Sequence, residues 1–226
     1  MIKKSSPAAA PAPAAKNQAG VEGGGAWEAK APVQKRALET RRKILESARA
    51  LFSEIGFEAT TTHLIAQGAG VSVGGLYAHF PNKEEIFLRL IADQAEHVHD
   101  VTRSCLARTA EEKMSPADAI DHIFSASYAV YSREVKLNLE VARFARVNSR
   151  AAEIHDYWEG RESRLVADWM AGDKAALNVD DVEAAVTVVA RSAHEVFQYL
   201  YKNHGQVDPD RILRHLTLMI KRFLLK

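Results

Sequence analysis

The sequence has little cysteine and no long apolar run, and both absences exclude whole classes of protein. Its single cysteine, Cys105, rules out an internal disulfide and fits a reducing compartment. Because no run of about eighteen apolar residues occurs, no transmembrane helix is expected. Lys3 and Lys4 precede an Ala/Pro segment whose prolines leave no apolar core for a signal peptide. We therefore expect a cytoplasmic protein without a membrane partner.

Motifs of catalysis are also lacking. The chain has no Gly-x-Ser-x-Gly elbow, no Walker loop and no Cys–His arrangement with supporting spacing. Glu96 and His99 form one Glu-x-x-His pair, but a di-iron bundle needs a second pair and further carboxylates. His97 points to a different helix face from His99, and Asp118 with His122 has no companion ligands. We therefore predict no enzyme, no cofactor and no metal site.

Charge is distributed unevenly along the chain. The formal net charge is only +1, yet residues 1–43 carry nine Lys or Arg against three Glu, so the remainder is net negative. A basic segment beside an acidic body fits a small region that meets phosphates and a larger one that does not.

Residues 1–33 have the composition of a tail. They contain ten Ala, four Pro and four Gly, with Trp27 as the single aromatic residue. Such a segment cannot bury enough apolar surface to offset its ordering entropy, so we expect it to be disordered.

The most informative segment is residues 61–83, whose pattern predicts two short helices joined by a tight turn. Apolar residues such as Ile65 recur at helical spacing, and Gly70 suits the left-handed end of the first helix. Ser72 can cap a second helix that turns Leu76 inward and its other side chains outward. This arrangement is typical of a helix-turn-helix, a motif that reads DNA.

A longer amphipathic helix is predicted just upstream, over residues 35–55. Ile44 and Phe52 belong to an apolar stripe at three- and four-residue spacing, and Gly56 is expected to end the helix. The three helices together have the size of a DNA-binding head.

Residues 38–87 resemble the N-terminal domain of the tetracycline-repressor (TetR) family of bacterial transcription regulators. The rest of the chain is similar to that family only in being long and helical. The matching positions are Ile44, Leu45, Ala48, Leu51, Phe52, Gly56, Phe57, Thr61, Thr62, Ile65, Ala66, Ala69, Gly70, Val71, Ser72, Leu76, Tyr77, His79, Phe80, Lys83 and Glu84.

The resemblance implies two groups of DNA-contacting residues. Val73, Gly74 and Gly75, which would face the bases, carry no hydrogen-bonding side chain. Direct readout would therefore rest on methyl contacts, close backbone approach, His63 and Ser72. DNA shape would supply the rest. Phosphate contacts are implied for Thr62, Tyr77, His79 and Lys83, and base-facing positions for His63, Ser72, Val73, Gly74 and Gly75.

Every segment after Lys83 has a helical pattern, without a credible strand or internal repeat. With the head, this predicts nine helices, the number usual in TetR-like regulators. The first body helix leaves the head directly, so it is the natural lever between head and body. The body helices are expected over residues 83–108, 116–131, 135–146, 149–170, 182–203 and 209–224.

Aromatic residues gather in the middle helices, where the resemblance implies a ligand cavity. Plain core packing is the alternative explanation for each of them. His122 and Arg143 are polar residues on otherwise apolar helices, so they are candidates for orienting a ligand. The predicted ligand-contacting residues are His122, Phe124, Tyr128, Tyr131, Arg143, Phe144 and Trp158.

The last two predicted helices are more apolar than packing within one subunit requires. Val189 and Leu216 lie on their apolar stripes, and such surface is best explained by a partner subunit. The resemblance implies that these helices pair with their copies in a four-helix dimer interface. Helix-turn-helix proteins usually dimerise to read two half-sites.

We therefore predict an all-α protein in three parts: a disordered tail (1–33), a helix-turn-helix DNA-binding domain (34–82) and a helical-bundle ligand-binding and dimerisation domain (83–226). The predicted function is a repressor that binds a palindromic double-stranded DNA operator as a homodimer and responds to a small-molecule effector. An activator of the same fold is the first alternative, and a helical-bundle enzyme carrying a helix-turn-helix is the second.

Overall fold

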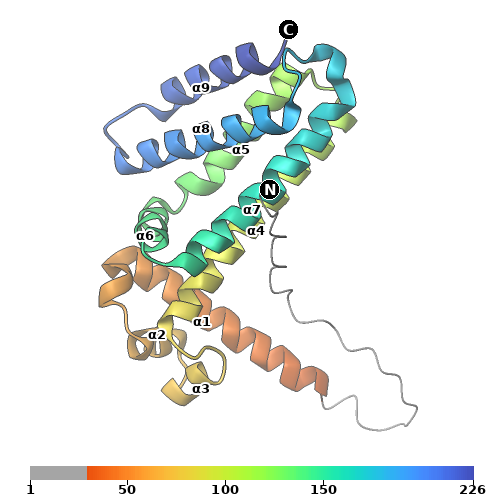
Figure 1. Ribbon diagram of the computed structural model, residues 1–226. Coiled ribbons are helices and arrows are strands. Elements are labelled where there is room, and N and C mark those ends of the chain that lie inside the picture. The colour runs from red at the N-terminus through yellow and green to blue at the C-terminus, as the bar shows by residue number, and fades with distance from the viewer. Residues whose placement is uncertain (1–29) are drawn as a thin grey trace, which may run out of the picture. The chain divides into compact units, whose positions relative to one another are not determined.

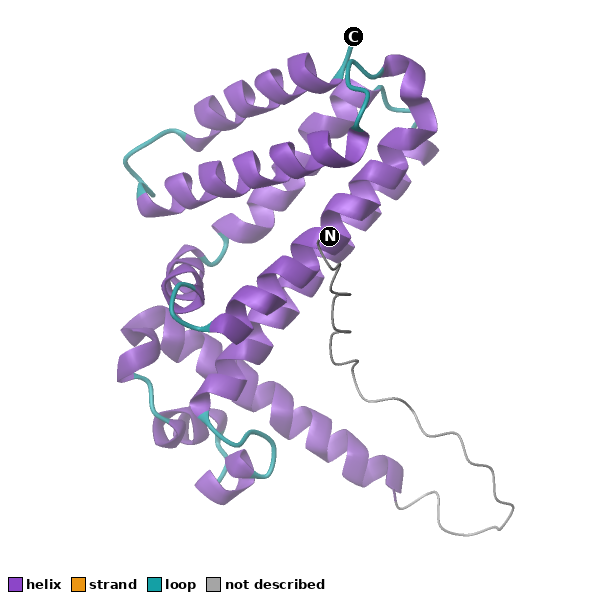
Figure 2. Cartoon of the chain, in the orientation of Figure 1, coloured by secondary structure: helices purple, strands orange, loops and turns teal. Residues whose placement is uncertain are grey.

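The computed structural model describes residues 30–226, and the tail predicted over residues 1–33 lies almost wholly outside that range. Residues 39–226 form one compact unit, and the contacts below lie within it. The described residues contain helices and one isolated bridge, between Leu177 and Leu225, but no strand (Figure 2). The predicted all-α fold is confirmed.

Nine α-helices and one short 3-10 helix make up the described chain (Figure 1). Their bounds agree closely with the predicted ones, but α1 and α4 extend beyond their predicted ends. The helices are α1 (Lys30–Ala59), α2 (Thr62–Ala69), α3 (Val73–Tyr77), α4 (Lys83–Glu111), α5 (Pro116–Ser132), α6 (Val135–Ala145), α7 (Ser149–Met170), η1 (Ala171–Ala176), α8 (Val182–Lys202) and α9 (Pro209–Leu224).

The break predicted at Gly56 is present. Gly56 has non-helical backbone angles, φ 81° and ψ 170°, and α1 consists of two helical segments that meet at this kink. A positive φ of this kind favours glycine, which has no Cβ to clash. The helical hydrogen bonding then resumes as far as Ala59, and the Thr60 hydroxyl donates to the Gly56 carbonyl at 2.7 Å.

Side-chain caps set where the short head helices begin. Thr61, Ser72 and Asn82 each accept a hydrogen bond from the backbone N–H three residues later, at 3.2, 3.0 and 2.8 Å. Gly70, with φ 65°, closes α2 in the left-handed conformation. Because these features are local, the predicted positions of α2 and α3 are confirmed.

Two apolar clusters hold the compact unit together. The first includes the fully buried Phe52, Ile65, Leu76 and Phe87 and joins α1, α2, α3 and the start of α4. The second includes Phe197 and joins α5, α7, α8 and α9, while α4 packs lengthwise on α7 and α5 (Figure 1). None of the described helices is both long and apolar enough to cross a membrane.

Candidate DNA-binding surface and ligand cavity

Helix α3 turns one face to the protein core and the other to solvent. Leu76 is fully buried, whereas Val73 and Tyr77 are 36% and 50% exposed. Gly74 is exposed and Gly75 is half-buried. The inward position predicted for Leu76 is therefore confirmed, and the opposite face of α3 is free to enter a groove of DNA.

The other predicted DNA-contacting residues lie around this face. His63 and Ser72 are exposed, and His79 is half-buried. The hydroxyl groups of Thr62 and Tyr77 lie 3.1 Å apart, so one donates to the other and the two form a polar pair between α2 and α3. Hydroxyl groups so placed can donate to phosphate oxygens, which positions a protein on a duplex.

Lys83 has a different role in the structure from the predicted one. Its ammonium donates to the carbonyl oxygens of Phe57, Glu58 and Thr60 at 2.8, 3.1 and 3.1 Å. It also lies 4.4 Å from the centre of the Phe57 ring. A lysine has three N–H donors, so all are occupied at the end of α1. This geometry does not support the predicted phosphate contact, because no donor is left for DNA.

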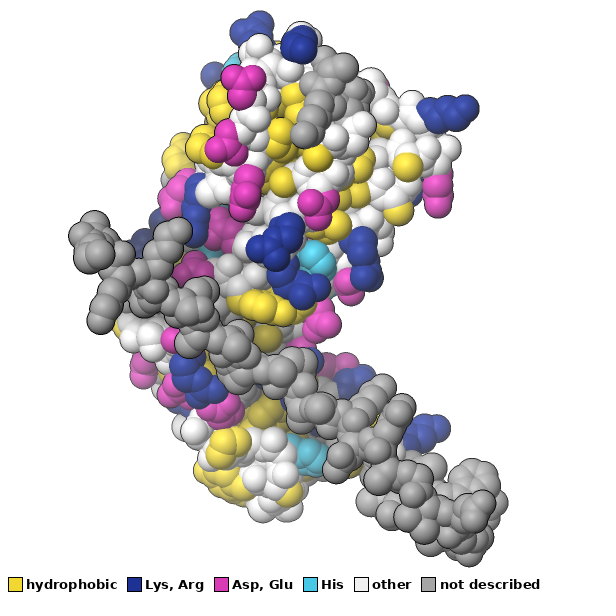
Figure 3. All heavy atoms as spheres, turned by 45° about the vertical axis from the view of Figure 1, so that its right-hand side comes forward, with side chains coloured by type: hydrophobic (Ala, Val, Ile, Leu, Met, Phe, Trp, Pro, Cys, Tyr) yellow, Lys and Arg dark blue, Asp and Glu magenta, His cyan; other side chains and the backbone are white. Residues whose placement is uncertain are grey.

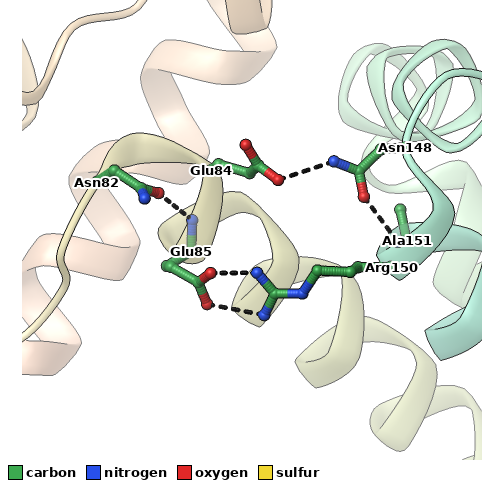
Figure 4. A network of polar contacts seen from close by, with 6 residues as sticks. All are labelled: Asn82, Glu84, Glu85, Asn148, Arg150 and Ala151. Atoms are coloured by element: carbon green, nitrogen blue, oxygen red, sulfur yellow. Dashed lines mark hydrogen bonds and ion pairs between the residues drawn. The ribbon is translucent and has the colours of Figure 1, made fainter.

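Polar contacts join the start of α4 to the start of α7 (Figure 4). Asn148 donates to the Glu84 carboxylate at 2.9 Å and also caps α7. Both oxygens of Glu85 accept from the guanidinium of Arg150, which lowers the pKa of the Glu85 carboxyl. We name these four residues the α4–α7 latch.

A second junction joins α1 to α6. The Glu140 carboxylate accepts from the backbone N–H of Phe57 at 3.0 Å, next to the kink at Gly56. Its other oxygen accepts from Arg143 at 2.6 Å. Arg49 of α1 pairs with Glu134 at the start of α6. The head therefore touches the body through α6 as well as α4 and α7.

A cavity of about 190 Å³ lies in the body, lined by residues of α4, α5, α7, α8 and α9. Three of the seven predicted ligand-contacting residues, Phe124, Tyr131 and Trp158, line it. The lining is mostly apolar, as is usual for a small-molecule site.

The other four predicted ligand residues lie elsewhere. Phe144 packs in the first apolar cluster, with its ring 4.7 Å from that of Phe57, and Arg143 is an exposed partner of Glu140. His122 lies beside Arg108, and Tyr128 packs on Phe197 outside the cavity lining. Helical spacing cannot tell these positions apart, because an apolar face can serve core, junction or cavity alike.

Sequence reasoning missed the polar groups of the cavity. Glu159 and Glu162 of α7 and His155 and His194 of α7 and α8 line it. Burial raises the pKa of the Glu162 carboxyl, although hydrogen bonding from Thr102 acts in the opposite direction. Burial lowers the pKa of His194, and the neighbouring His155 adds to that effect. The sequence did carry one indication of them, because these charged residues stand among apolar residues on their helices.

Comparison with known proteins supports the interpretation of the N-terminal helices as a helix-turn-helix head. A family model for bacterial regulatory proteins of the tetR family matches residues 44–90. The transcriptional repressor KstR2 of Rhodococcus jostii is 30% identical over 187 residues, covering 80% of this chain and 88% of that protein. The chain belongs to the tetR family.

Two further proteins show how far the likeness reaches. KstR2 of Mycobacterium tuberculosis is 33% identical over 125 residues, 52% of this chain but only 62% of that relative's length. The Thermus thermophilus FadR structure, a TetR-family repressor in complex with lauroyl-CoA, has a TM-score of 0.60 and 20% identity. It covers 80% of this chain, and 92% of that chain is matched. The family consists of regulators, so the alternative of a helical-bundle enzyme is not favoured.

In this tetR-family protein, one group of side chains has the spacing of metal ligands. His155, Asp156 and Glu159 bring ligand atoms within 4.8 Å of one another, a grouping that the sequence analysis did not identify. Arg191, however, lies 3.0 Å from Glu159 and 3.7 Å from Asp156. Its guanidinium already supplies positive charge to both carboxylates, so the group fits an ion pair better than a metal site.

Proposed function

We propose that this protein is a cytoplasmic transcriptional repressor that binds a palindromic DNA operator as a homodimer and releases it when a small molecule fills the cavity. The observation that carries the proposal is the free outer face of α3, anchored from behind by the buried Leu76. Such a helix matches the width of a major groove. Val73, Gly74 and Gly75 of α3, with His63 and Ser72, would face the bases.

Dimerisation is supported by apolar side chains that one subunit leaves exposed on α8 and α9 (the α8–α9 face). Val188 of α8 is 57% exposed and Met219 of α9 is 53% exposed. Figure 3 shows hydrophobic side chains reaching the surface in several places on the face that it draws. Surface of this kind marks an interface. The residues that the sequence analysis assigned to the interface are not the exposed ones. Val189 lines the cavity and Leu216 is buried within the subunit. The exposed members of the α8–α9 face are Val188, Tyr199, Leu218, Met219 and Phe223.

Ligand response is supported by the position of the cavity on α7. The same helix carries Trp158, Glu159 and Glu162 in the cavity and Arg150 in the α4–α7 latch. A ligand that moves α7 would therefore move the start of α4, which follows α3 directly in the chain. We therefore assign the transmission of the signal to two helices, α4 and α7, which pack along each other, instead of to α4 alone.

The spacing of the two recognition helices would transmit the signal to DNA. In a dimer these helices must be about 34–36 Å apart to reach successive major grooves. A ligand shifts that spacing only by binding its two states with different affinities. A coupling of about 1–3 kcal/mol would lower operator affinity roughly 5–150-fold.

A gel-shift titration on the DNA upstream of the protein's own gene tests this function. Wild type should bind one fragment much more tightly than unrelated DNA of equal length, as a dimer and with strong salt dependence. Tyr77→Ala should weaken binding to both fragments, while Tyr157→Ala, a control at an exposed tyrosine of α7, should not. Equal affinity of wild type for both fragments would refute a sequence-specific regulator. Placing the bound site relative to the promoter separates repressor from activator.

A further inference from the structure

We propose that the cavity takes a small organic cation, an amine or quaternary ammonium whose apolar body is about the size of one ring. This inference rests on the proposed function, because it assigns a chemical class to the effector of the same cavity. Three features of the described lining support it: the sign of its charge, its aromatic rings and its volume.

The fixed charge of the lining is negative. Among the described residues that line the cavity, Glu159 and Glu162 are acidic and none is Lys or Arg. Burial disfavours the charged form of His194 and so lowers its pKa. A buried carboxylate favours an opposite charge nearby and disfavours a like one. A carboxylate or phosphate ligand would therefore meet repulsion here, in addition to the cost of its own desolvation.

Glu162 is the carboxylate most available to a ligand. One of its oxygens accepts from the Thr102 hydroxyl, and the other lies 3.7 Å from Nδ1 of His99. That nitrogen is buried and has no hydrogen-bond partner among the described residues. No Lys or Arg pairs with Glu162 in the described structure. Its partners in the described structure are therefore a neutral hydroxyl and an imidazole, and it has no permanently charged partner.

Glu159 is partly compensated by Arg191, which does not line the cavity, and by His155, which does. Its Oε2 lies 3.0 Å from Arg191 and 3.6 Å from Nδ1 of His155, but the atom is buried and forms no well-aligned hydrogen bond. We therefore expect Glu162 to dominate the attraction for a cation, with Glu159 adding to it.

Aromatic rings from several helices line the same cavity as the carboxylates. Tyr131 of α5, Trp158 and Trp169 of α7 and Phe197 of α8 line the cavity. The N–H of Trp169 is already used, because it donates to the Thr109 hydroxyl at 3.1 Å. The faces of aromatic rings attract organic cations through the ring quadrupole.

The volume limits the size of the ligand. An engineered cavity of about 150 Å³ in another protein holds benzene. The cavity here, about 190 Å³, therefore has space for one ring and a small charged substituent.

Three probes of nearly equal size and different charge test the inference. Benzylamine is a cation at neutral pH, benzyl alcohol is neutral and benzoate is an anion. Binding is measured by calorimetry and tryptophan fluorescence, in EDTA so that no metal contributes. We expect benzylamine to bind at least about tenfold more tightly than either of the others. Equal or tighter binding of benzoate or benzyl alcohol, or no binding of benzylamine, would overturn the assignment.

Matched variants locate the site. Glu162→Gln should weaken benzylamine binding about tenfold or more and reduce its preference over benzyl alcohol. Glu153→Gln removes the same charge from an exposed position on the same helix and should leave both unchanged. Glu159→Gln should have an intermediate effect. If Glu162→Gln folds, as judged by circular dichroism, and binds benzylamine like wild type, the assignment is wrong.

Operator release separates this inference from the proposed function. Benzylamine that binds with the expected dependence on Glu162 but leaves the operator complex intact would contradict the induction mechanism and leave the cation site standing. If a neutral or anionic compound fills the cavity and releases the operator while benzylamine does not bind, the cation site is contradicted and the induction mechanism stands.

Discussion

At the scale of single residues, the two glycines of α3 have different reasons to be glycine. A Cβ added at Gly74 would meet no atom within 4 Å, so the fold itself leaves space there. A Cβ at Gly75 would lie 3.1 Å from the Ser72 hydroxyl oxygen that caps the helix. A side chain at position 75 would therefore crowd the cap, whereas the open space beside Gly74 would let DNA approach the backbone in the proposed complex.

We predict that Gly74→Ala separates stability from DNA binding. Alanine should raise the free energy of unfolding by up to about 1 kcal/mol, because glycine loses more entropy in a helix. Operator affinity should fall if the backbone of α3 approaches the bases. Thermal unfolding and gel shifts on the same samples measure both. Unchanged operator affinity would show that Gly74 does not lie against DNA.

Lys83 and Tyr77 should differ in the same two measurements. Lys83→Ala leaves carbonyl oxygens of α1 without their donor, so we expect a loss of about 1–3 kcal/mol in unfolding free energy. Lys83→Met keeps the aliphatic stem beside Phe57, so it should recover only the part of the lost unfolding free energy that comes from packing. Tyr77→Ala, at an exposed position, should cost less than about 0.5 kcal/mol yet weaken binding to all DNA sequences. Equal stability of wild type and Lys83→Ala would contradict the structural role.

At the scale of helices, polar junctions connect the head and body. Glu84 and Glu85 at the start of α4 meet Asn148 and Arg150 at the start of α7. Arg150 is about half exposed, so the pair contributes little to stability and is screened by salt. Its importance lies in the position of α4 relative to α7, which ligand binding would change.

We predict that Arg150→Ala weakens the coupling between ligand and operator more than it weakens the fold. The expected loss of stability is below about 1 kcal/mol. Because Arg150 lowers the pKa of Glu85, its contribution is present at neutral pH and is lost as the pH falls through that lowered pKa. Ligand-induced release of the operator, measured at matched ligand saturation, should be smaller in the variant. Arg164→Ala, on the same helix and outside the latch, serves as the control. Unaltered release in Arg150→Ala would show that the α4–α7 latch carries no signal.

At the scale of the whole molecule, the proposed function requires a second copy of the chain. One head would reach one half-site, so the α8–α9 face would be as necessary for operator binding as α3. Val188 and Met219 belong to this face, whereas Leu216 supports it from within the subunit.

Charges introduced on that face should give monomers. We expect Val188→Glu with Met219→Glu to remain folded, since both side chains are exposed in one subunit, and to lose operator binding by losing the partner. Light scattering at micromolar concentration reports the mass, and circular dichroism reports the fold. Val147→Glu is the control, because Val147 is 87% exposed and lies outside α8 and α9. A monomeric wild type, or a dimeric double variant, would contradict this interface.

Local features of the sequence determined the helices and the head. The Ser72 cap, the left-handed Gly70 and the inward Leu76 depend on residues three or four positions apart, so the local sequence predicted them. Only the tertiary structure decided which apolar helix faces meet each other. It placed Phe144 in the head–body junction and grouped Glu162 with His99 and Thr102, because contacts between helices depend on packing angles that periodicity does not encode. Packing likewise turned the Lys83 ammonium toward the end of α1, since its carbonyl partners lie more than twenty residues away in sequence.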